Sequence, residues 1–263
     1  MSDTARASDA PTDVDDRRRP SIHAAAGRLT LGSQVVTHGL DVHHDCVEMT
    51  FVSYHLFSVT GRRCDARQAR VLDQLWITTG YADARIWCNR IAGYLGSARV
   101  DAAFAMSAAL AASNSVGYGF RAMSAAYSVQ AAIPDSEAAR EAWLTELLSE
   151  GRILHGYGRP VHGHDERIGT ALAILAQAGL RAGPALKKAF ALDRDLRAKK
   201  GIEMNIAALW AALCIDFGID AREYEAFMLL MLTPGYAAVY ADQRRRPALS
   251  FLRGHRTKLG EAE

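Results

Sequence analysis

Apolar residues recur at helical spacing along most of this chain. After Asp65, for example, Ala69, Leu72 and Trp76 follow one another at intervals of three or four residues, which places them on one face of a helix. A shorter stretch over 30–42 alternates apolar and polar residues and predicts a small strand pair or an extended arm. The helical spacing predicts helices over 46–59, 65–76, 85–94, 101–112, 122–133, 136–149, 168–178, 184–199, 205–217, 222–231 and 235–244. Because no strand alternation and no βαβ pattern follows residue 45, the predicted fold class is all-α, with roughly ten or more helices.

Glycine and short polar residues mark the ends of several of these helices. Gly61 suits a left-handed cap at the end of the first helix. Asp65 and Asn205 stand directly before apolar periodic stretches, where their side chains can cap the helices that begin there. After residue 133, either Asp135 or Ser136 is placed to cap the next helix.

The composition narrows the classes of partner. Hydrophobic residues make up 49% of the 263 positions, which is enough for a substantial core. The formal net charge is +2, which argues against nucleic acid as the main partner, because binding phosphates needs a concentrated basic surface. We interpret the arginine runs at 17–19 and 244–246 as solvated surface. No apolar run reaches the roughly 18–20 residues that a bilayer span needs, so we expect no membrane partner.

The cysteines and the two ends of the chain point to a cytoplasmic protein. No two cysteines form a CxxC pair, which argues against a structural zinc site. Residues 1–27 are polar and carry no secretory signal, and we expect both them and residues 257–263 to be disordered tails. Reduced thiols are therefore predicted at the four cysteines, Cys46, Cys64, Cys88 and Cys214.

The densest group of chemically active side chains lies in residues 156–167, Gly-Tyr-Gly-Arg-Pro-Val-His-Gly-His-Asp-Glu-Arg. Glycines let a backbone approach a ligand closely. Arginines can bind a carboxylate or a phosphate through two parallel hydrogen bonds, and histidines can move protons near neutral pH. The sequence therefore predicts a binding or catalytic site in this loop.

Four stretches, in order along the chain, resemble motifs of the citrate synthase family. Residues 51–64 (FVSYHLFSVTGRRC) resemble F-x-E-x-x-Y-L-L-x-T-G-x-x-P, and the loop 156–167 resembles Gly-Phe-Gly-His-Arg-Val-Tyr-Lys…Asp-Pro-Arg. Residues 204–206 resemble the start of the L-N-V-D helix, and residues 232–236 resemble R-x-x-G-W. The order and spacing are most similar to the shorter, citryl-CoA-lyase-like members.

This resemblance implies a citrate-synthase-like multi-helical fold over residues 28–256, with a large helical domain and a small one. The small subdomain would take roughly residues 150–200. The resemblance also implies a homodimer, because the Ala-rich stretch 102–112 is similar to the family's dimer interface. The implied partner is a small-molecule carboxylate or an acyl-coenzyme A, with a coenzyme A thioester as possible substrate and no tightly bound cofactor.

The positions that carry the family's chemistry are substituted in this chain. In the family, two histidines and an aspartate enolise the acetyl-CoA methyl group and polarise the keto-acid carbonyl. Tyr118 stands at the histidine of G-P-L-H-G-G-A, Arg159 at the histidine of G-x-G-H-R, and Ala207 at the aspartate of N-V-D. A further family histidine would fall near residues 79–83, which contain none. The carboxylate-binding D-P-R segment persists as Asp-Glu-Arg at residues 165–167.

These substitutions keep groups that donate hydrogen bonds and remove the family's base. Ala207 has no acid–base group. Tyr118 donates a hydrogen bond well, but a phenol with an ordinary pKa of about 10 is a poor base at neutral pH. Arg159 stays protonated and cannot relay a proton. We therefore expect Tyr118 and Arg159 to stabilise an oxyanion, and ordinary citrate synthase activity to be absent.

A relocated base would come from His162, His164 or Asp165. The two histidines are the catalytic candidates, because an imidazole has an ordinary pKa near 6.5. The alternative is that both are exposed loop residues without a chemical role. His-x-His-Asp also has metal-ligand spacing, but no further ligands lie nearby in sequence, so we expect no metal site.

The candidate substrate-binding residues are Arg167, Asp165, Arg121 and Asn205. Arg167 lies just before an apolar helix, where an anion is favoured, and its alternative role is an ion pair with Asp165 or Glu166. Arg121 either meets a phosphate or carboxylate or lies on the surface. Asn205 either contacts substrate or only caps its helix.

Two functions fit this pattern. The first is a diverged citrate-synthase-like or citryl-CoA-lyase-like enzyme, which forms or cleaves a carbon–carbon bond, or performs related enolate chemistry, on a carboxylate-bearing substrate. The second is a non-catalytic, metabolite-binding or regulatory protein of the same fold. The first is the leading hypothesis, and the loss of every aligned acid–base residue is the reason for the second.

Overall fold

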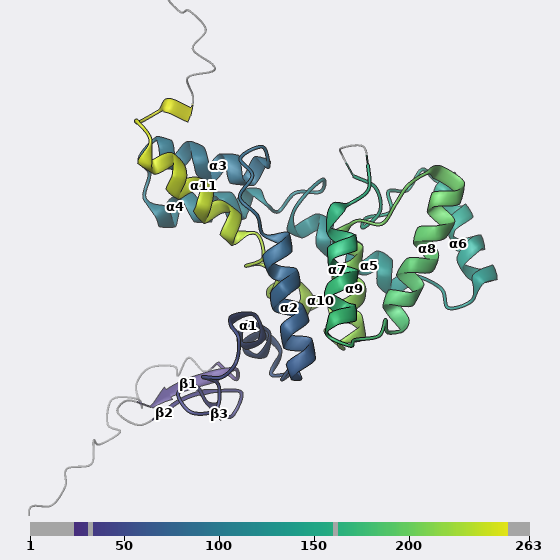
Figure 1. Cartoon of the computed structure of the whole chain (residues 1–263), viewed down its shortest axis with the longest axis horizontal. Helices are drawn as coiled ribbons and strands as arrows, with labels where there is room; N and C mark the ends of the chain where they lie inside the picture. The colour runs from purple at the N-terminus through teal and green to yellow at the C-terminus, as the bar shows by residue number, and fades with distance from the viewer. Residues whose placement is uncertain (1–23, 31–33, 160–162, 252–263) are drawn as a thin grey trace, which may run out of the picture. The chain divides into compact units, whose positions relative to one another are not determined.

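A computed structural model describes residues 24–30, 34–159 and 163–251 of the chain (Figure 1). The chain divides into two units, with the boundary between Glu48 and Met49. Each unit is described by itself.

The first unit contains a small antiparallel sheet in the order β1-β2-β3. In this sheet, Arg28 pairs with Val36, and Val36 pairs with Asp41. His38 has a φ of 44° and Gly39 a φ of 83°, so the two residues between β2 and β3 make the tight turn that joins these strands. Of the two alternatives predicted for residues 30–42, the strand pair is confirmed. The strands are β1 (Gly27–Thr30), β2 (Gln34–Thr37) and β3 (Leu40–Asp41).

The named elements of the second unit are all helices, joined by loops, which confirms the predicted all-α class. The helices are α1 (Phe51–Thr60), α2 (Ala66–Thr79), α3 (Trp87–Ser97), α4 (Ala102–Ala112), α5 (Phe120–Ala132), α6 (Glu137–Ser149), α7 (Glu166–Gln177), α8 (Pro184–Lys200), α9 (Ile206–Asp216), α10 (Ala221–Met228) and α11 (Thr233–Arg245).

The predicted caps are present at four of these helix ends. Gly61 closes α1 in the left-handed conformation with a φ of 72°. Asp65 starts α2 with a capping box, in which it accepts from the Gln68 amide and the Gln68 side chain accepts from the Asp65 amide. Ser136 caps α6, and Asn205 caps α9.

Helix α9 forms the centre of the core. It is apolar on every face, and its Trp210 is fully buried, because α5, α7 and α8 all pack against it (Figure 1). The Trp210 ring packs edge-on against Trp76, and its Nε1 donates to Oγ1 of Thr79 at 3.0 Å. This bond ties the carboxyl end of α2 to the middle of α9.

Helices α2 and α7 run antiparallel. They contact each other along their lengths, and a Cβ added at Gly179, just beyond α7, would lie 4.0 Å from Nη1 of Arg67, in the first turn of α2. The helices have 14 and 12 residues, so their other ends also lie close together. The amino end of α7 therefore lies near Thr79 at the carboxyl end of α2.

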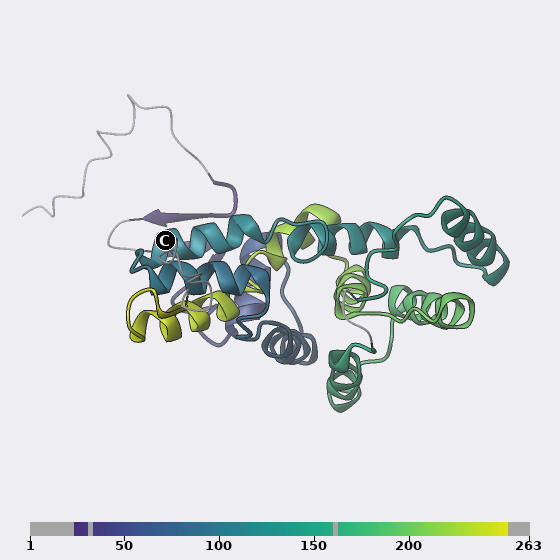
Figure 2. The ribbon, with the colours of Figure 1, turned by 90° about the horizontal axis from the view of Figure 1, so that it is seen from above.

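Helices α3, α4 and α11 form a second packed group, with α11 lying against both α3 and α4 (Figure 1, Figure 2). Two glycines allow α3 to approach α11 closely. A Cβ at Gly96 would lie 2.6 Å from the carbonyl oxygen of Tyr240, and one at Gly93 would lie 3.0 Å from Val239. This group carries the loop of residues 80–86 at the amino end of α3.

Candidate functional site

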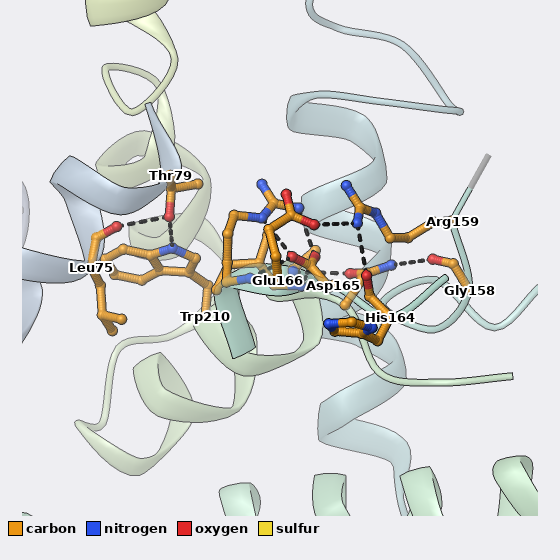
Figure 3. A network of polar contacts seen from close by, with 12 residues as sticks. Leu75, Thr79, Gly158, Arg159, His164, Asp165, Glu166 and Trp210 are labelled. Carbon is orange, nitrogen blue, oxygen red and sulfur yellow. Dashed lines mark hydrogen bonds and ion pairs between the residues drawn. The ribbon is translucent and has the colours of Figure 1, made fainter. Parts of the chain in front are cut away.

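The buried carboxylate of Asp165 lies where the amino ends of α7 and α9 meet (Figure 3). Its Oδ1 accepts from the Arg167 amide at 3.1 Å and from Arg167 Nε at 2.7 Å. Its Oδ2 accepts from Arg167 Nη2 at 2.6 Å and from the Ile206 amide at 2.9 Å. One carboxylate thus caps α7, satisfies an amide of α9 and holds the guanidinium of Arg167 in two parallel bonds.

This arrangement keeps Asp165 ionised. Burial raises the pKa of its carboxyl group. The hydrogen bonds and charge of Arg167, together with the amides of Ile206 and Arg167, lower this pKa by more than burial raises it. The net pKa lies below the ordinary value for aspartate. The ion pair between Arg167 and Asp165, one of the alternatives from the sequence, is therefore present.

Arg167 keeps one edge of its guanidinium free of partners among the described residues. Nε and Nη2 are taken by Asp165, whereas Nη1 makes no hydrogen bond there. Burial lowers the pKa of Arg167, but Asp165 raises it more, and the phenols of Tyr81 and Tyr118 raise it further. Arg167 is thus a charged donor with a free edge, close to two tyrosines.

Tyr118 lies in the loop between α4 and α5, whose backbone is fixed by the next residue. Gly119 has a φ of 104°, and a Cβ there would lie 2.0 Å from the carbonyl oxygen of Ser113. The Phe120 amide donates to that same oxygen at 2.9 Å, which closes the loop. Burial raises the pKa of Tyr118 above its ordinary value, and Arg167 lowers it by less. The Tyr118 phenol therefore stays protonated near neutral pH and has a proton to donate.

Tyr81 is a member of this group that the sequence reasoning did not select. It lies in residues 79–83, the segment noted for lacking the family's histidine, and its phenol acts on the pKa of both Arg167 and Tyr118. The sequence could have suggested Tyr81, because it is an aromatic hydroxyl in the segment that carries a histidine in the family. The effect on the pKa reaches Arg167 from the loop after α2, and α2 packs against α7.

Arg159 closes the outer part of the loop. Its Nη1 donates to Oε2 of Glu166 at 2.6 Å and to the carbonyl oxygen of His164 at 3.0 Å (Figure 3). The His164 residue is exposed. His162 lies outside the described residues. Arg159 therefore holds the loop to the first turn of α7 through Glu166.

Asn205 joins the glycine-rich loop to α9. Its Oδ1 accepts from the Ala207 amide at 3.0 Å, and its Nδ2 donates to the carbonyl oxygen of Gly158 at 2.7 Å. Two backbone bonds extend the junction, from the Gly158 amide to Glu203 at 2.7 Å and from the Asn205 amide to Gly156 at 2.9 Å. The Asn205 side chain therefore caps α9 and fixes the loop.

Gly156 has the backbone that a close approach requires. Its φ is 94°, and a Cβ there would lie 2.8 Å from the side chain of Ala208. Ala207 lies in the first turn of α9 beside this approach and carries only a methyl group. The described residues at this junction thus supply amides and donors, whereas Ala207 offers no base.

Arg121 lies on the first turn of α5 and is exposed. It lines a separate cavity of about 550 Å³ between α4, α5 and α10, whose lining includes none of the residues around Arg167. The structure therefore groups Arg167 and Asp165 with Tyr118, and places Arg121 apart from them. The cavity is lined by Leu110, Asn114, Phe120, Arg121, Met123, Ser124, Tyr224, Glu225, Met228 and Leu229.

Neither a metal cluster nor a membrane span is found in the part of the chain that the structure describes. No three His, Cys, Asp or Glu side chains there come together as a metal site requires. No helix in the same residues has the length and apolar character needed to cross a bilayer. None of the four cysteines, all within the described residues, is in a disulfide, and Cys46, Cys88 and Cys214 are buried.

Solved structures with the same fold include a citryl-CoA lyase, an ATP citrate lyase and a citrate synthase. Citryl-CoA lyase from Hydrogenobacter thermophilus matches with a TM-score of 0.77 at 16% identity, covering 87% of this chain and 90% of that chain. ATP citrate lyase from Methanothrix soehngenii, in complex with citrate and coenzyme A, gives 0.74 at 14% identity, covering 93% of this chain and 43% of that chain. Citrate synthase from Thermotoga maritima MSB8 gives 0.60 at 18% identity, with coverages of 73% and 52%.

No curated protein matches this sequence. At such low identities, the structural similarities establish the fold alone. The model of the family described as citrate synthase, C-terminal domain, matches residues 7–251, which is nearly the whole chain. The sequence motifs, the helical fold and this match together show that the chain belongs to the citrate synthase family.

Proposed function

We propose that this protein binds a carboxylate-bearing substrate, as a coenzyme A thioester, and makes or breaks a carbon–carbon bond beside its acyl carbonyl. The observation that carries the proposal is the free Nη1 edge of Arg167. Asp165 fixes that edge in place where the amino ends of α7 and α9 meet, and helix amino ends favour anions. Membership of the citrate synthase family supports this class of chemistry.

The roles of the donors follow from their protonation. Arg167 binds the substrate carboxylate through Nη1. Tyr118, whose pKa is raised, donates a hydrogen bond to the oxygen on which negative charge develops. Arg159, with its charge balanced by Glu166, supports the oxyanion less directly, by holding the loop around it.

Proton transfer is assigned to the loop histidines. Ala207 has no acid–base group, Tyr118 is held in its protonated form, and Asp165 is engaged by Arg167. In the proposal His164, whose residue is exposed, or His162 moves the proton. A pH profile of turnover that follows an imidazole would support this assignment, and an unchanged profile in His162→Gln and His164→Gln would oppose it.

The related structures suggest the substrate class and the assembly. Citrate and coenzyme A are bound in the ATP citrate lyase structure, so citryl-CoA and similar acyl esters are the first compounds to test. We also propose that the protein is cytoplasmic and forms a homodimer. The homodimer is proposed because Phe104 is 73% exposed on the Ala-rich helix α4 and a partner subunit would cover it. Light scattering of the wild type and of Phe104→Ser would measure the assembly.

The central experiment is the pair Arg167→Ala and Arg167→Lys, with Arg70→Ala as control. Arg70 is an exposed arginine on α2 and takes part in none of the hydrogen bonds described at the site. We expect both Arg167 variants to lose citrate and acyl-CoA binding in calorimetry and to lose turnover, while Arg70→Ala behaves as wild type. The lysine variant keeps a charge beside Asp165, so it separates lost binding from lost folding, which circular dichroism checks. Wild-type binding in Arg167→Lys would oppose the proposal.

A non-catalytic role is the second candidate. It is favoured by Ala207, which has no acid–base group, and by Tyr118 and Asp165, because Tyr118 is held protonated and Asp165 is engaged by Arg167. Product analysis after incubation with citryl-CoA separates the two candidates, because a binding protein returns the ester unchanged. Citrate formed from oxaloacetate and acetyl-CoA is not expected in either case.

A further inference from the structure

The cavity between α4, α5 and α10 has no part in the roles proposed around Arg167. Its volume of about 550 Å³ lies within the ordinary range of small-molecule sites, roughly 300–1,000 Å³. Arg121, a candidate from the sequence for binding a carboxylate or a phosphate, lies in its wall. The cavity is therefore a second place at which the chain can hold a ligand.

The inner wall of this cavity is apolar and buried. Phe120, Met123, Met228 and Tyr224 all line it and are all buried. Methionine side chains adapt to ligands of different shape. The Tyr224 hydroxyl has no hydrogen-bond partner among the described residues, and a buried polar group in that state favours a ligand or an ordered water that supplies one. This wall suits an aliphatic or aromatic side chain.

Two opposite charges line the same cavity without a partner. Arg121 lies on the first turn of α5 and Glu225 lies on α10, and both residues are exposed. Within the described part of the chain, neither side chain forms a hydrogen bond or an ion pair, with the other or with any neighbour. A lining with one cation and one anion is complementary to a ligand that carries one charge of each sign.

The amino end of α5 indicates where the negative group of such a ligand would lie. Gly119 is the N-cap residue of this 13-residue helix, and no side chain caps the first turn. The helix dipole adds roughly half a unit of positive charge there, beside Arg121. Glu225 lies on α10, which packs against α5. A carboxylate is therefore favoured at Arg121 and an ammonium group at Glu225.

We infer that this cavity binds an apolar α-amino acid in its zwitterionic form. Such a ligand carries its carboxylate and its ammonium group on one carbon, so both can meet the charged side chains while the apolar side chain enters the cavity. Nucleotides and dicarboxylates suit the site less well, because they lack a positive group for Glu225. The inference goes beyond the proposed function and does not depend on it.

A ligand in this cavity would contact both ends of the loop that carries Tyr118. Asn114 and Phe120 line the cavity, and a backbone bridge joins Asn114 to Gly119. Contacts at both ends oppose local opening of the loop. We therefore expect the bound amino acid to slow hydrogen exchange at the amides of residues 114–120, and to leave exchange in the distant helix α6 unchanged.

The test measures the binding of L-leucine, L-methionine and L-phenylalanine by calorimetry on the full chain. Two analogues of leucine each lack one charge: 4-methylpentanoate has no ammonium group, and 3-methylbutylamine has no carboxylate. Glycine lacks the apolar side chain. We expect at least one of the three amino acids to bind, and L-leucine to bind roughly tenfold or more tightly than either analogue or glycine.

Charge-removing variants assign the two ends of the ligand. Arg121→Gln should lower the affinity for leucine roughly tenfold and leave that for 3-methylbutylamine within about twofold, because the amine never used the arginine. Glu225→Gln should lower the affinity for leucine similarly and spare 4-methylpentanoate. Arg222→Gln is the matched control, because Arg222 is an exposed arginine on α10 outside the cavity lining. Circular dichroism checks that each variant is folded.

Several outcomes would overturn the inference. It fails if wild type binds none of the three amino acids, as it would if a second copy of the chain filled the cavity, which light scattering would detect. It also fails if Arg121→Gln and Glu225→Gln bind leucine as wild type does, or if Arg222→Gln loses as much affinity as they do. Loss of leucine binding in Arg167→Lys would place the amino acid at the other site. Because the proposed function is tested with citrate and acyl esters, its failure would leave this inference standing.

Discussion

Two arginine–carboxylate pairs lie within a few residues of each other and differ in burial. The inner pair, Arg167 with Asp165, has side chains 13% and 0% exposed and is joined by two parallel bonds. The outer pair, Arg159 with Glu166, has side chains 19% and 60% exposed and is joined through one guanidinium nitrogen. Removing one partner of a buried pair leaves an uncompensated charge, whereas water and salt replace an exposed partner readily. The inner pair is therefore expected to contribute strongly to the stability of the fold, and the outer pair is expected to contribute little.

The largest expected effect is on the inner pair. Asp165→Ala should lower the free energy of unfolding by about 3–5 kcal/mol, because it leaves the Arg167 guanidinium buried without its partner and removes the cap of α7. Urea unfolding at pH 7 measures the loss. The matched variant is Asp101→Ala at the start of α4, where the aspartate makes no capping bond, and we expect a change of less than about 0.5 kcal/mol. Similar losses in both variants would contradict the prediction that Asp165 stabilises the fold through its pair with Arg167.

Acid should remove the advantage of the inner pair. The pKa of Asp165 is lowered in the folded chain, so its stabilising contribution is present above the unfolded value near 3.9 and is lost as the pH falls through the folded value. The stability difference between wild type and Asp165→Ala is thus expected to stay constant from pH 7 to about pH 5 and to shrink below about pH 4. Unfolding curves at several pH values check this. A difference that stays constant down to pH 2 would show that the ionised carboxylate is not what stabilises the junction.

The smallest expected effect on stability is at the outer pair. Glu166→Gln should change the free energy of unfolding by less than about 1 kcal/mol, because the Glu166 side chain is largely exposed. Since the variant leaves the charge of Arg159 unbalanced, we expect citrate to bind roughly two- to fivefold more tightly at low salt. Glu150→Gln, which disrupts an exposed pair with Arg152, is the control. Equal tightening in both variants would mean that net charge alone is responsible.

Local signals in the sequence predicted much of the fold. Asp65 and Asn205 were identified as caps because a short polar side chain before an apolar periodic stretch has a local reason to be there. The pair of Arg167 and Asp165 was also among the alternatives, because the two residues are only two positions apart in the sequence. Each of these features involves residues a few positions apart.

Features that depend on tertiary packing were not predictable in this way. Tyr81 raises the pKa of Arg167 from the loop after α2, and no local pattern in the sequence specifies that α2 packs against α7. Arg121 is close to Tyr118 in sequence, but side chains on a helix turn by about 100° per residue, and it lines a different cavity. The partner of Arg159 lies seven residues away across an aperiodic loop.

The paired segments around Gly158 and Glu203 have a topological consequence. The segments around residues 158 and 203 lie side by side. The Gly158 amide donates to the Glu203 carbonyl oxygen, and Tyr157 forms a backbone bridge with Met204. The intervening residues, including α7 and α8, thus leave the junction and return to it, while both helices pack against α9. Lengthening such an excursion costs only about 0.6 kcal/mol per doubling in loop-closure entropy. Evolution can therefore add residues at its outer turns while the junction that holds Arg167 keeps its geometry.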